Sequence, residues 1–325
     1  MIPTYNCVHH LHSALNSVLQ QDPGPDQMQI EVIDDASTAG DPGALVSSMG
    51  GRVGFWRQPN NVGHVRNFET CLARSRGRLV HLLHDDDAVR PGFYATMERA
   101  LRAHPEIGAA FCRHVYIDEQ GHPISLGRIV QEEPGVIESW LPRIAVRQRL
   151  QTCAIVVRRE VYERLGGFDR RIQTYGEDWE MWARIAAHYP VWYEPEPLAE
   201  YRLHPVSLAK RSYRTGQNVR DLRQAIEIIR SYLPPELQDS LTKQARKEAA
   251  LVAVRQASKS ARLGDWATAR IQIKEGCKTS LAPVVLTRIA WTGLRDIARW
   301  GARPLRRTTR RSVVARTSVG EDHAA

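Results

Sequence analysis

The sequence predicts an α/β fold over residues 1–212 and an α-helical region over residues 213–325. Until about residue 210, short apolar runs typical of buried strands alternate with segments whose apolar residues follow a helical period. Two of the apolar runs end directly in neighbouring aspartates, and strand signals stop after about residue 212. Alternating strands and helices predict a mostly parallel, Rossmann-like sheet with helices on both faces.

The first strand is expected to be truncated. Only Ile2 stands between Met1 and Pro3, and proline is disfavoured in a central strand because it cannot donate a ladder hydrogen bond. We therefore expect the natural chain to begin upstream of residue 1.

The other elements follow from apolar spacing and turn residues. Apolar runs predict strands at residues 30–33, 53–56, 79–83, 107–116 and 152–157. A helical period predicts helices at residues 12–20, 66–76, 93–103, 159–165, directly after Gly176, 215–232, 236–262 and 265–279. Residues 118–150 are irregular and rich in glycine and proline, and we expect them to shape a binding site.

Three consecutive carboxylates, Asp85, Asp86 and Asp87, follow the buried run at residues 79–83. Open α/β sheets bind ligands at the carboxyl ends of their strands. Adjacent negative charges repel one another, and a divalent cation would remove that cost. Carboxylate oxygens suit Mg²⁺ or Mn²⁺, which in turn bind diphosphates. On the motif alone, a solvated loop or a helix cap before Pro91 explains the triplet equally well.

Further polar side chains stand at comparable places. Asp34 and Asp35 follow the expected strand at residues 30–33. Asp178 falls in the first turn of a helix, where the helix dipole favours its ionised form. Taken alone, Asp178 is better explained as first-turn charge, and His204, before a proline, as a structural histidine.

Composition limits the class of protein. The chain has 325 residues, of which 42% are apolar, enough to form a buried core. No apolar run approaches the roughly 20 residues that span a membrane, and the first residues lack the pattern of a signal peptide. The five cysteines are far apart and form no CxxC pair, which favours a reducing cytosol over a disulfide framework or zinc site.

The net charge of +9 is concentrated in a C-terminal tail. Residues 299–320 contain seven arginines and no acid, so the rest of the chain is close to neutral. Residues 285–301 form an amphipathic pattern that runs into this tail and suits an anionic membrane surface. A helix packed on its neighbours, with a solvated tail, explains the pattern equally well. Few aromatic residues follow Trp300, which argues against a nucleic-acid partner.

Seven short motifs in order over about residues 2–208 resemble family 2 glycosyltransferases. Each motif is weak alone, and their order and spacing carry the resemblance. In this sequence they read Ile2-Pro3-Thr4-Tyr5-Asn6, Val32-Ile33-Asp34-Asp35-Ala36-Ser37-Thr38, Asn61-Val62-Gly63-His64-Val65-Arg66-Asn67, Leu83-His84-Asp85-Asp86-Asp87, Gly166-Gly167-Phe168-Asp169, Glu177-Asp178-Trp179-Glu180-Met181-Trp182 and Tyr201-Arg202-Leu203-His204.

The resemblance implies a GT-A fold and a metal-dependent, inverting transfer of a sugar, of the hexosyltransferase type, from a nucleoside-diphosphate sugar to an acceptor hydroxyl. It implies Asp178 as the catalytic base. It implies that Mg²⁺ or Mn²⁺ is held first by Asp86, with Asp87 and His204. The same resemblance implies that the donor is bound by Pro3, Thr4, Tyr5, Asp34, Asp35, Arg66 and Asp85.

The family's usual pattern often has an acid where this chain has His84. The resemblance therefore leaves open which role each of the three aspartates has. No Gln-x-x-Arg-Trp stretch follows Asp178, so we expect transfer of one or a few sugars rather than polymer extrusion. A cytoplasmic enzyme of cell-envelope polysaccharide synthesis, peripheral on the inner face of the membrane and using a glycan or lipid-linked acceptor, fits this resemblance and the basic tail.

Two alternative interpretations explain parts of the sequence. A nucleotidyltransferase would explain the sheet and the acids, but no GxGxxG or GxxxxGK[ST] phosphate loop occurs. A catalytically impaired GT-A-like scaffold would explain a truncated first strand.

Overall fold

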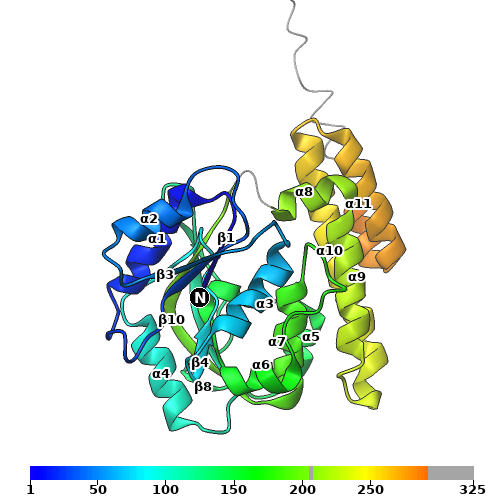
Figure 1. Ribbon diagram of the computed structural model, residues 1–325. Helices are drawn as coiled ribbons and strands as arrows, with labels where there is room; N and C mark the ends of the chain where they lie inside the picture. Colours follow the sequence, from blue (N-terminus) through cyan, green and yellow to red (C-terminus); the bar gives the residue numbers. More distant parts are fainter. Residues whose placement is uncertain (205–207, 292–325) are drawn as a thin grey trace, which may run out of the picture.

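The computed structural model describes residues 1–204 and 208–291. An N-terminal part built on two sheets stands beside a group of C-terminal helices (Figure 1). The first sheet is parallel throughout and has the order β1-β2-β3, with β1 (Ile2–Thr4), β2 (Glu31–Asp34) and β3 (Gly54–Arg57). The first strand, β1, therefore forms with three residues.

The second sheet has seven strands and mixed directions. Its main path runs β4-β9-β6-β10-β5, with β4 (Leu79–His81), β9 (Ile155–Arg158), β6 (Ala109–Ile117), β10 (Val191–Arg202) and β5 (Ala88–Val89). Two short strands extend it, since β7 (Pro123–Leu126) pairs with β6 and β8 (Gly135–Val136) pairs with β10.

Hydrogen bonds join the two sheets at β1 and β4. The amino group of Met1 donates to the carbonyl of His81 at 2.9 Å, and the Leu83 amide donates to the carbonyl of Met1 at 3.1 Å. Because β1 and β2 are parallel and β1 lies against the end of β4, the segments that follow these three strands meet at one edge.

Helices cover both faces of the sheets. One hydrophobic cluster packs α1 (Val8–Leu19), α2 (Pro42–Ser48) and α4 (Phe93–Ala103) against one face. A second cluster packs α3 (His64–Arg74), α5 (Trp140–Val146), α6 (Arg159–Leu165) and α7 (Glu177–His188) against the other. Neighbouring strand residues belong to opposite clusters, Val32 to the first and Ile33 to the second, as the two-residue period of a strand requires.

The C-terminal helices extend the second cluster. They are α8 (Leu208–Thr215), α9 (Gln217–Arg230), α10 (Pro235–Arg262), α11 (Trp266–Thr279) and helical residues 283–291. Ile226 of α9 and Ala245 of α10 are buried in the same cluster as Trp182 of α7. In Figure 1, α5 and α7 lie between the sheets and these helices, so the two parts share one core.

The fold class predicted from the sequence is confirmed, but the sheet is less parallel than expected. β9 runs antiparallel to both β4 and β6, whereas β6 and β10 are parallel. A short apolar run does not indicate whether a strand runs parallel or antiparallel to its neighbours, which explains this error. The sequence also failed to predict β10, because Pro195 and Pro197 interrupt it; they sit where the register with β6 shifts.

The amphipathic pattern at residues 285–301 is described as helix only up to Trp291, and the arginine tail lies outside the described residues. Within residues 1–204 and 208–291, no helix is long and apolar enough to cross a membrane.

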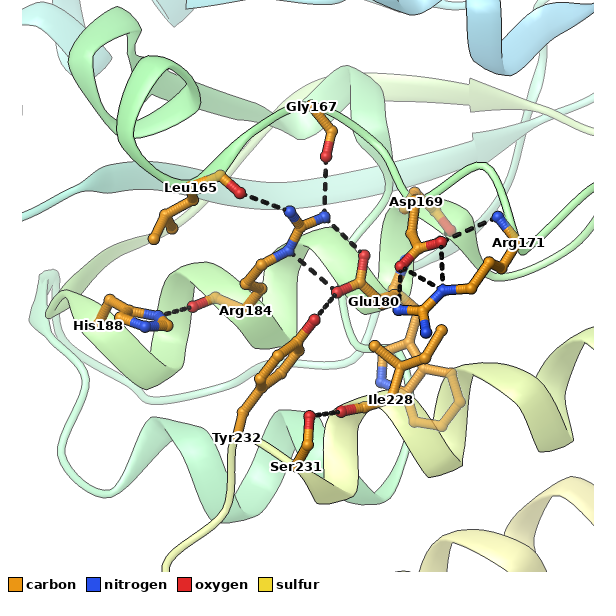
Figure 2. A network of polar contacts seen from close by, with 12 residues as sticks. Leu165, Gly167, Asp169, Arg171, Glu180, Arg184, His188, Ile228, Ser231 and Tyr232 are labelled. Carbon is orange, nitrogen blue, oxygen red and sulfur yellow. Dashed lines mark hydrogen bonds and ion pairs between the residues drawn. The ribbon is translucent and has the colours of Figure 1, made fainter.

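A buried carboxylate on α7, Glu180, forms an ion pair within the helix and a hydrogen bond to the C-terminal helical part (Figure 2). The Glu180 carboxylate is fully buried and accepts two hydrogen bonds from the Arg184 guanidinium, at 2.8 and 3.0 Å. It also accepts one from the hydroxyl of Tyr232, which follows α9, at 2.6 Å. Arg184 donates further to the carbonyls of Leu165 and Gly167, so every charge in this network is compensated.

We expect Arg184→Met to lower the free energy of unfolding by about 3 kcal/mol, because it leaves the Glu180 carboxylate buried without its cation. Denaturant unfolding measures the effect. The matched control is Arg246→Met, which breaks an exposed ion pair with Glu227 on the same group of helices and is expected to cost less than about 1 kcal/mol. Equal losses in the two variants would contradict the role given to this network.

Candidate active site

The three carboxylates after β4 are each held by a different partner. Asp85 Oδ2 accepts hydrogen bonds from the Thr4 hydroxyl at 2.5 Å and from the Tyr5 amide at 3.3 Å. Thr4 is the last residue of β1, and Tyr5 follows it. Asp86 Oδ2 lies 2.7 Å from Nε2 of His204, which follows β10. Three strands therefore bring together five residues that the sequence predicted for one site: Thr4, Tyr5, Asp85, Asp86 and His204.

Asp87 faces inward and is only half satisfied. Its Oδ1 accepts the Arg202 amide at 2.9 Å. Its Oδ2 is buried and has no hydrogen-bond partner within the described residues; His84 Nδ1 lies 3.9 Å away. The side chain of Arg202 donates to the carbonyl of Asp86 at 2.7 Å, so β10 holds the backbone of the acidic segment as well.

His84, Asp86 and Asp87 are arranged as a candidate metal site. One ligand atom from each lies within 4.8 Å of the others. His84 Nε2 and Asp87 Oδ2 are both buried and lack hydrogen-bond partners among residues that the structure describes. Carboxylate oxygens suit Mg²⁺ or Mn²⁺, so this donor set fits a divalent cation. The sequence prediction placed His204 in the site in addition to Asp86 and Asp87, but omitted His84 as a ligand.

The electrostatics of the triplet differ from residue to residue. Burial, and then the Asp86 charge, raise the pKa of Asp85 to about 8 and hold the pKa of Asp87 well above its usual range. Burial also opposes ionisation of Asp86, but the His204 hydrogen bond and nearby imidazoles outweigh it and lower the pKa of Asp86. One full negative charge is thus favoured at Asp86, beside the candidate metal site.

Asp34 and Asp35 shape the loops beyond β2. Asp34 is fully buried, lies 3.0 Å from the Arg57 guanidinium and accepts hydrogen bonds from Ser37. Asp35 accepts the amides of Val62 and Gly63 at 2.7 and 3.0 Å. Both side chains therefore have structural partners, and their predicted contact with a donor stays a prediction.

The other predicted donor residues lie in different settings. Pro3 is buried within β1, whereas Tyr5 is 45% exposed beside Asp85. Arg66 is exposed on the first turn of α3, and its guanidinium has no partner in the described part of the chain. The structure brings Tyr5 to the acidic segment, but no contact brings Arg66 there.

Asp178 lies at the start of α7, after Gly176, whose φ of 94° is a left-handed conformation that favours glycine. Asp178 Oδ2 accepts hydrogen bonds from Gln148 and, at 3.4 Å, from the Thr152 hydroxyl. Burial, and then the Glu177 charge, raise the pKa of Asp178 to about 7. The helix dipole favours the ionised form of Asp178, as the sequence predicted, but burial acts in the opposite direction and raises its pKa.

His64 and Glu177 connect the two sides of the site, and the sequence analysis gave neither a role. His64 Nε2 lies 3.1 Å from Glu177 Oε1. Although burial favours the neutral imidazole, the hydrogen bond and charge of Glu177 raise the pKa of His64. The loop held by Asp35 leads directly into His64, so β2 is linked to the helix of Asp178. Both residues stand inside motifs quoted from the sequence, which is the signal that could have found them.

Charge interactions connect the acidic segment with the start of α7. The charges of both Asp86 and Glu177 act on His84. Burial, and then the charges of Asp87, Asp86 and Asp178, raise the pKa of Tyr201 on β10. The acidic segment and the start of α7 therefore share one electrostatic environment.

Comparison with known proteins identifies the class. Residues 1–166, half of the chain, match glycosyl transferase family 2. The chain belongs to this family and is a glycosyltransferase. The family match favours this class over the nucleotidyltransferase alternative.

The individual proteins that match this chain share low sequence identity with it. The chain is 28% identical over 234 residues to "Uncharacterized protein MT1568" of Mycobacterium tuberculosis (strain CDC 1551 / Oshkosh), covering 68% of this chain and 71% of that protein. The structure is similar to S. aureus TarS, with a TM-score of 0.61, 14% identity and 92% of this chain covered. The chain spans about half of that TarS chain, 53% of its length.

Two complexes with nucleotide sugars have the same fold. S. aureus TarS 1-349 in complex with UDP-GlcNAc matches with a TM-score of 0.56 and 12% identity, covering 86% of this chain and 91% of that one. Mannosyltransferase PcManGT from Pyrobaculum calidifontis, in complex with GDP-Man and Mn²⁺, matches with a TM-score of 0.56 and 19% identity, covering 93% and 86%. These similarities confirm the GT-A fold.

The raised pKa of Asp178 has a direct test. We expect Glu177→Gln to lower the pKa of Asp178 below its value of about 7, because the variant removes a neighbouring negative charge and leaves the burial. Carbon-13 NMR titration of the carboxyl groups, assigned with Asp178→Asn, measures it. An unchanged pKa would show that the Glu177 charge does not reach Asp178.

Proposed function

We propose that the protein transfers a sugar, by a metal-dependent and inverting reaction, from a nucleoside-diphosphate sugar to an acceptor hydroxyl. The observation that carries this proposal is the convergence of a candidate metal site with a buried carboxylate of nearly neutral pKa, Asp178, in one electrostatic environment. Nucleotide sugars bound to two proteins of the same fold support the donor class.

His84, Asp86 and Asp87 would hold the cation. A bound Mg²⁺ or Mn²⁺ would supply charge stabilisation for the leaving diphosphate. His204 lies against Asp86 Oδ2 and orients that carboxylate, which also favours its ionised form. The Mn²⁺ in the PcManGT complex supports a divalent ion.

The nucleotide would lie at the carboxyl ends of β1, β2 and β4, where parallel strands of such sheets bind ligands. Thr4, Tyr5 and Asp85 already contact one another there. Pro3, Asp34 and Asp35 support the same edge through β1 and the loops beyond β2, and exposed Arg66 would reach the phosphates from α3.

Asp178 would act as the general base. A base works best when its pKa is near the working pH, and Gln148 and Thr152 hold one of its oxygens in place. The acceptor oxygen forms a bond to the anomeric carbon while the bond from that carbon to the diphosphate breaks. The hydroxyl proton passes to Asp178, and the diphosphate leaves with the bonding electrons. Attack from the face opposite the diphosphate inverts the anomeric centre.

The biological setting is part of the same proposal. The chain would add one or a few hexose units to a glycan or lipid-linked acceptor of the cell envelope. It would work in the cytoplasm, at the inner membrane face, with the arginine tail directed to anionic lipid.

The donor and the metal are tested together. Nucleotide release is measured from UDP-, GDP- and dTDP-sugars with Mn²⁺, with Mg²⁺ and with a chelator. We expect metal-dependent release from one donor, reduced at least about 100-fold in Asp86→Ala, because the variant removes the charged ligand. The control, Asp239→Asn, changes an acid that is 93% exposed on α10 and is expected to retain full activity.

The result can also contradict the proposal. Release that is equal with metal and with chelator would overturn the metal role. The absence of both release and metal-dependent nucleotide binding for every donor would favour the impaired-scaffold alternative.

The base is tested by substitution and by pH. We expect Asp178→Asn to lower kcat about 1,000-fold and to leave the Kd for the donor unchanged. In the unsubstituted enzyme kcat/KM should rise with pH through about 7, because the base works only when unprotonated and its pKa is raised to about 7. Full activity of Asp178→Asn, or a flat pH profile between pH 5 and 8, would remove Asp178 from the role of base.

A further inference from the structure

A cavity of about 490 Å³ lies directly beside Asp178, on the side of the C-terminal helices. Gln148 lines this cavity and also donates a hydrogen bond to Asp178, and Trp179 is the next residue along α7. The lining comes from segments far apart in the sequence, among them Tyr116, Arg128, Arg147, Trp179 and Arg255.

The cavity is separate from the expected nucleotide site. Its lining includes no residue from the carboxyl ends of β1, β2 or β4, where Thr4, Asp34 and Asp86 lie. It is bounded instead by the loop after α5, the start of α7 and one side of α10. Asp178 itself does not line the cavity, but Gln148, its hydrogen-bond partner, and Trp179, the next residue, do, so an acceptor bound there would lie close to this carboxylate.

Positive charge dominates the lining. Three arginines, Arg128, Arg147 and Arg255, face a single acid, Glu248. The Arg147 guanidinium lies 3.8 Å from Glu248, which is a loose ion pair. Arg128 and Arg255 are exposed to the cavity and have no hydrogen-bond or ion-pair partner in residues 1–204 and 208–291. Both guanidinium groups are therefore available to a ligand in the cavity.

Neighbouring arginines add to this charge. Burial, and then the charges of Arg147, Arg143 and Arg128, lower the pKa of Arg149. Arg149 directly follows the lining residues Arg147 and Gln148 in the sequence. Burial also lowers the pKa of Arg255; the Glu248 charge opposes this, and Arg147 and Arg288 add to it. Like charges gathered in a partly dry site are costly, and a bound anion would offset that cost.

The positive lining continues past the cavity. A second cavity of about 430 Å³ shares Arg255 and is also lined by Lys259, Arg288 and Trp291, and its lining in the described residues contains no acid. Arg255 therefore lines two basic cavities, one of which is also lined by Gln148, the hydrogen-bond partner of Asp178. An acceptor with more than one anionic group could follow this path along α10.

We propose that the cavity beside Asp178 binds an acceptor that carries a phosphate ester near its reacting hydroxyl. Guanidinium groups bind phosphate oxygens with paired hydrogen bonds, and Arg128, Arg147 and Arg255 converge from three segments. Tyr116, Tyr175 and Trp179 supply aromatic walls for the carbon skeleton. A volume of about 490 Å³ is within the range of sites for small organic ligands. The assignment as acceptor site rests on the proposed transfer reaction.

Binding is tested in pairs of probes that differ only in phosphate. Glucose 1-phosphate is compared with methyl glucoside, and a glycerol phosphate oligomer with glycerol, by calorimetry in the presence of chelator. We expect the phosphate-bearing probe of each pair to bind and the neutral one not to. Equal binding within both pairs would overturn the proposal.

The arginines are tested with a matched control. Arg147→Gln and Arg255→Gln should each weaken binding of the phosphate probes at least about 10-fold. Arg246→Gln, an exposed arginine on α10 that does not line the cavity, should leave binding unchanged. Equal affinities in all variants would overturn the assignment. Weaker nucleotide binding with metal in Arg147→Gln would instead assign these arginines to the donor and would also overturn it.

The source of the phosphate is separated by a third probe, a polyprenyl-phosphate-linked sugar in detergent. Tighter binding of this probe than of the glycerol phosphate oligomer identifies a lipid-linked acceptor, and the reverse identifies a water-soluble polymer. Acceptor-free nucleotide release reports on the proposed function alone. Absent release with arginine-dependent phosphate binding defeats the transfer reaction, whereas normal release without such binding defeats only the acceptor assignment.

Discussion

Three consecutive carboxylates at the end of a buried strand are the constraint on which the rest of this structure depends. Such charges repel one another and lose hydration, so each needs a partner of its own. The end of β1 supplies Thr4 for Asp85, and the end of β10 supplies His204 for Asp86 and a backbone amide for Asp87. Strands far apart in the sequence must therefore end beside β4, and that requirement gathers the site.

The helical region belongs to the same construction. Its core is continuous with that of the sheets, and the Glu180 carboxylate on α7 is neutralised by Arg184 and bonded to Tyr232 beyond α9. The start of α7 carries Asp178, so the position of that carboxylate depends on helices that contribute nothing to the nucleotide side. The cavity beside Asp178 is bounded by both parts and exists only because they share a core.

The sequence was sufficient for features that depend on local pattern. Apolar runs located β2, β3, β4, β6 and β9, and the helical period located α6 and α7. β10 was missed because its prolines look like breaks, although the register shifts with β6 accommodate Pro197. The raised pKa of Asp178 was missed because burial is a property of the folded chain. In the sequence, 19 positions separate Arg128 from Arg147 and 108 separate Arg147 from Arg255, so only folding reveals them as neighbours.

The charge distribution around Asp178 has a consequence for selectivity. On one side lies the acidic segment Asp85–Asp87, whose negative charge is favoured at Asp86 and which would accept a diphosphate together with a divalent cation. On the other side lie Arg128, Arg147 and Arg255, which would accept a phosphate without a metal. A donor and an acceptor that are both anionic would therefore bind on different sides of Asp178: the metal-bound diphosphate at the aspartates and the metal-free phosphate at the arginines. Because a metal-bound diphosphate has lost much of its negative charge, the arginines gain little from it, whereas a bare phosphate is repelled by the aspartates. Opposite charge on the two sides of one base is then sufficient to keep two phosphate-bearing substrates in their own places.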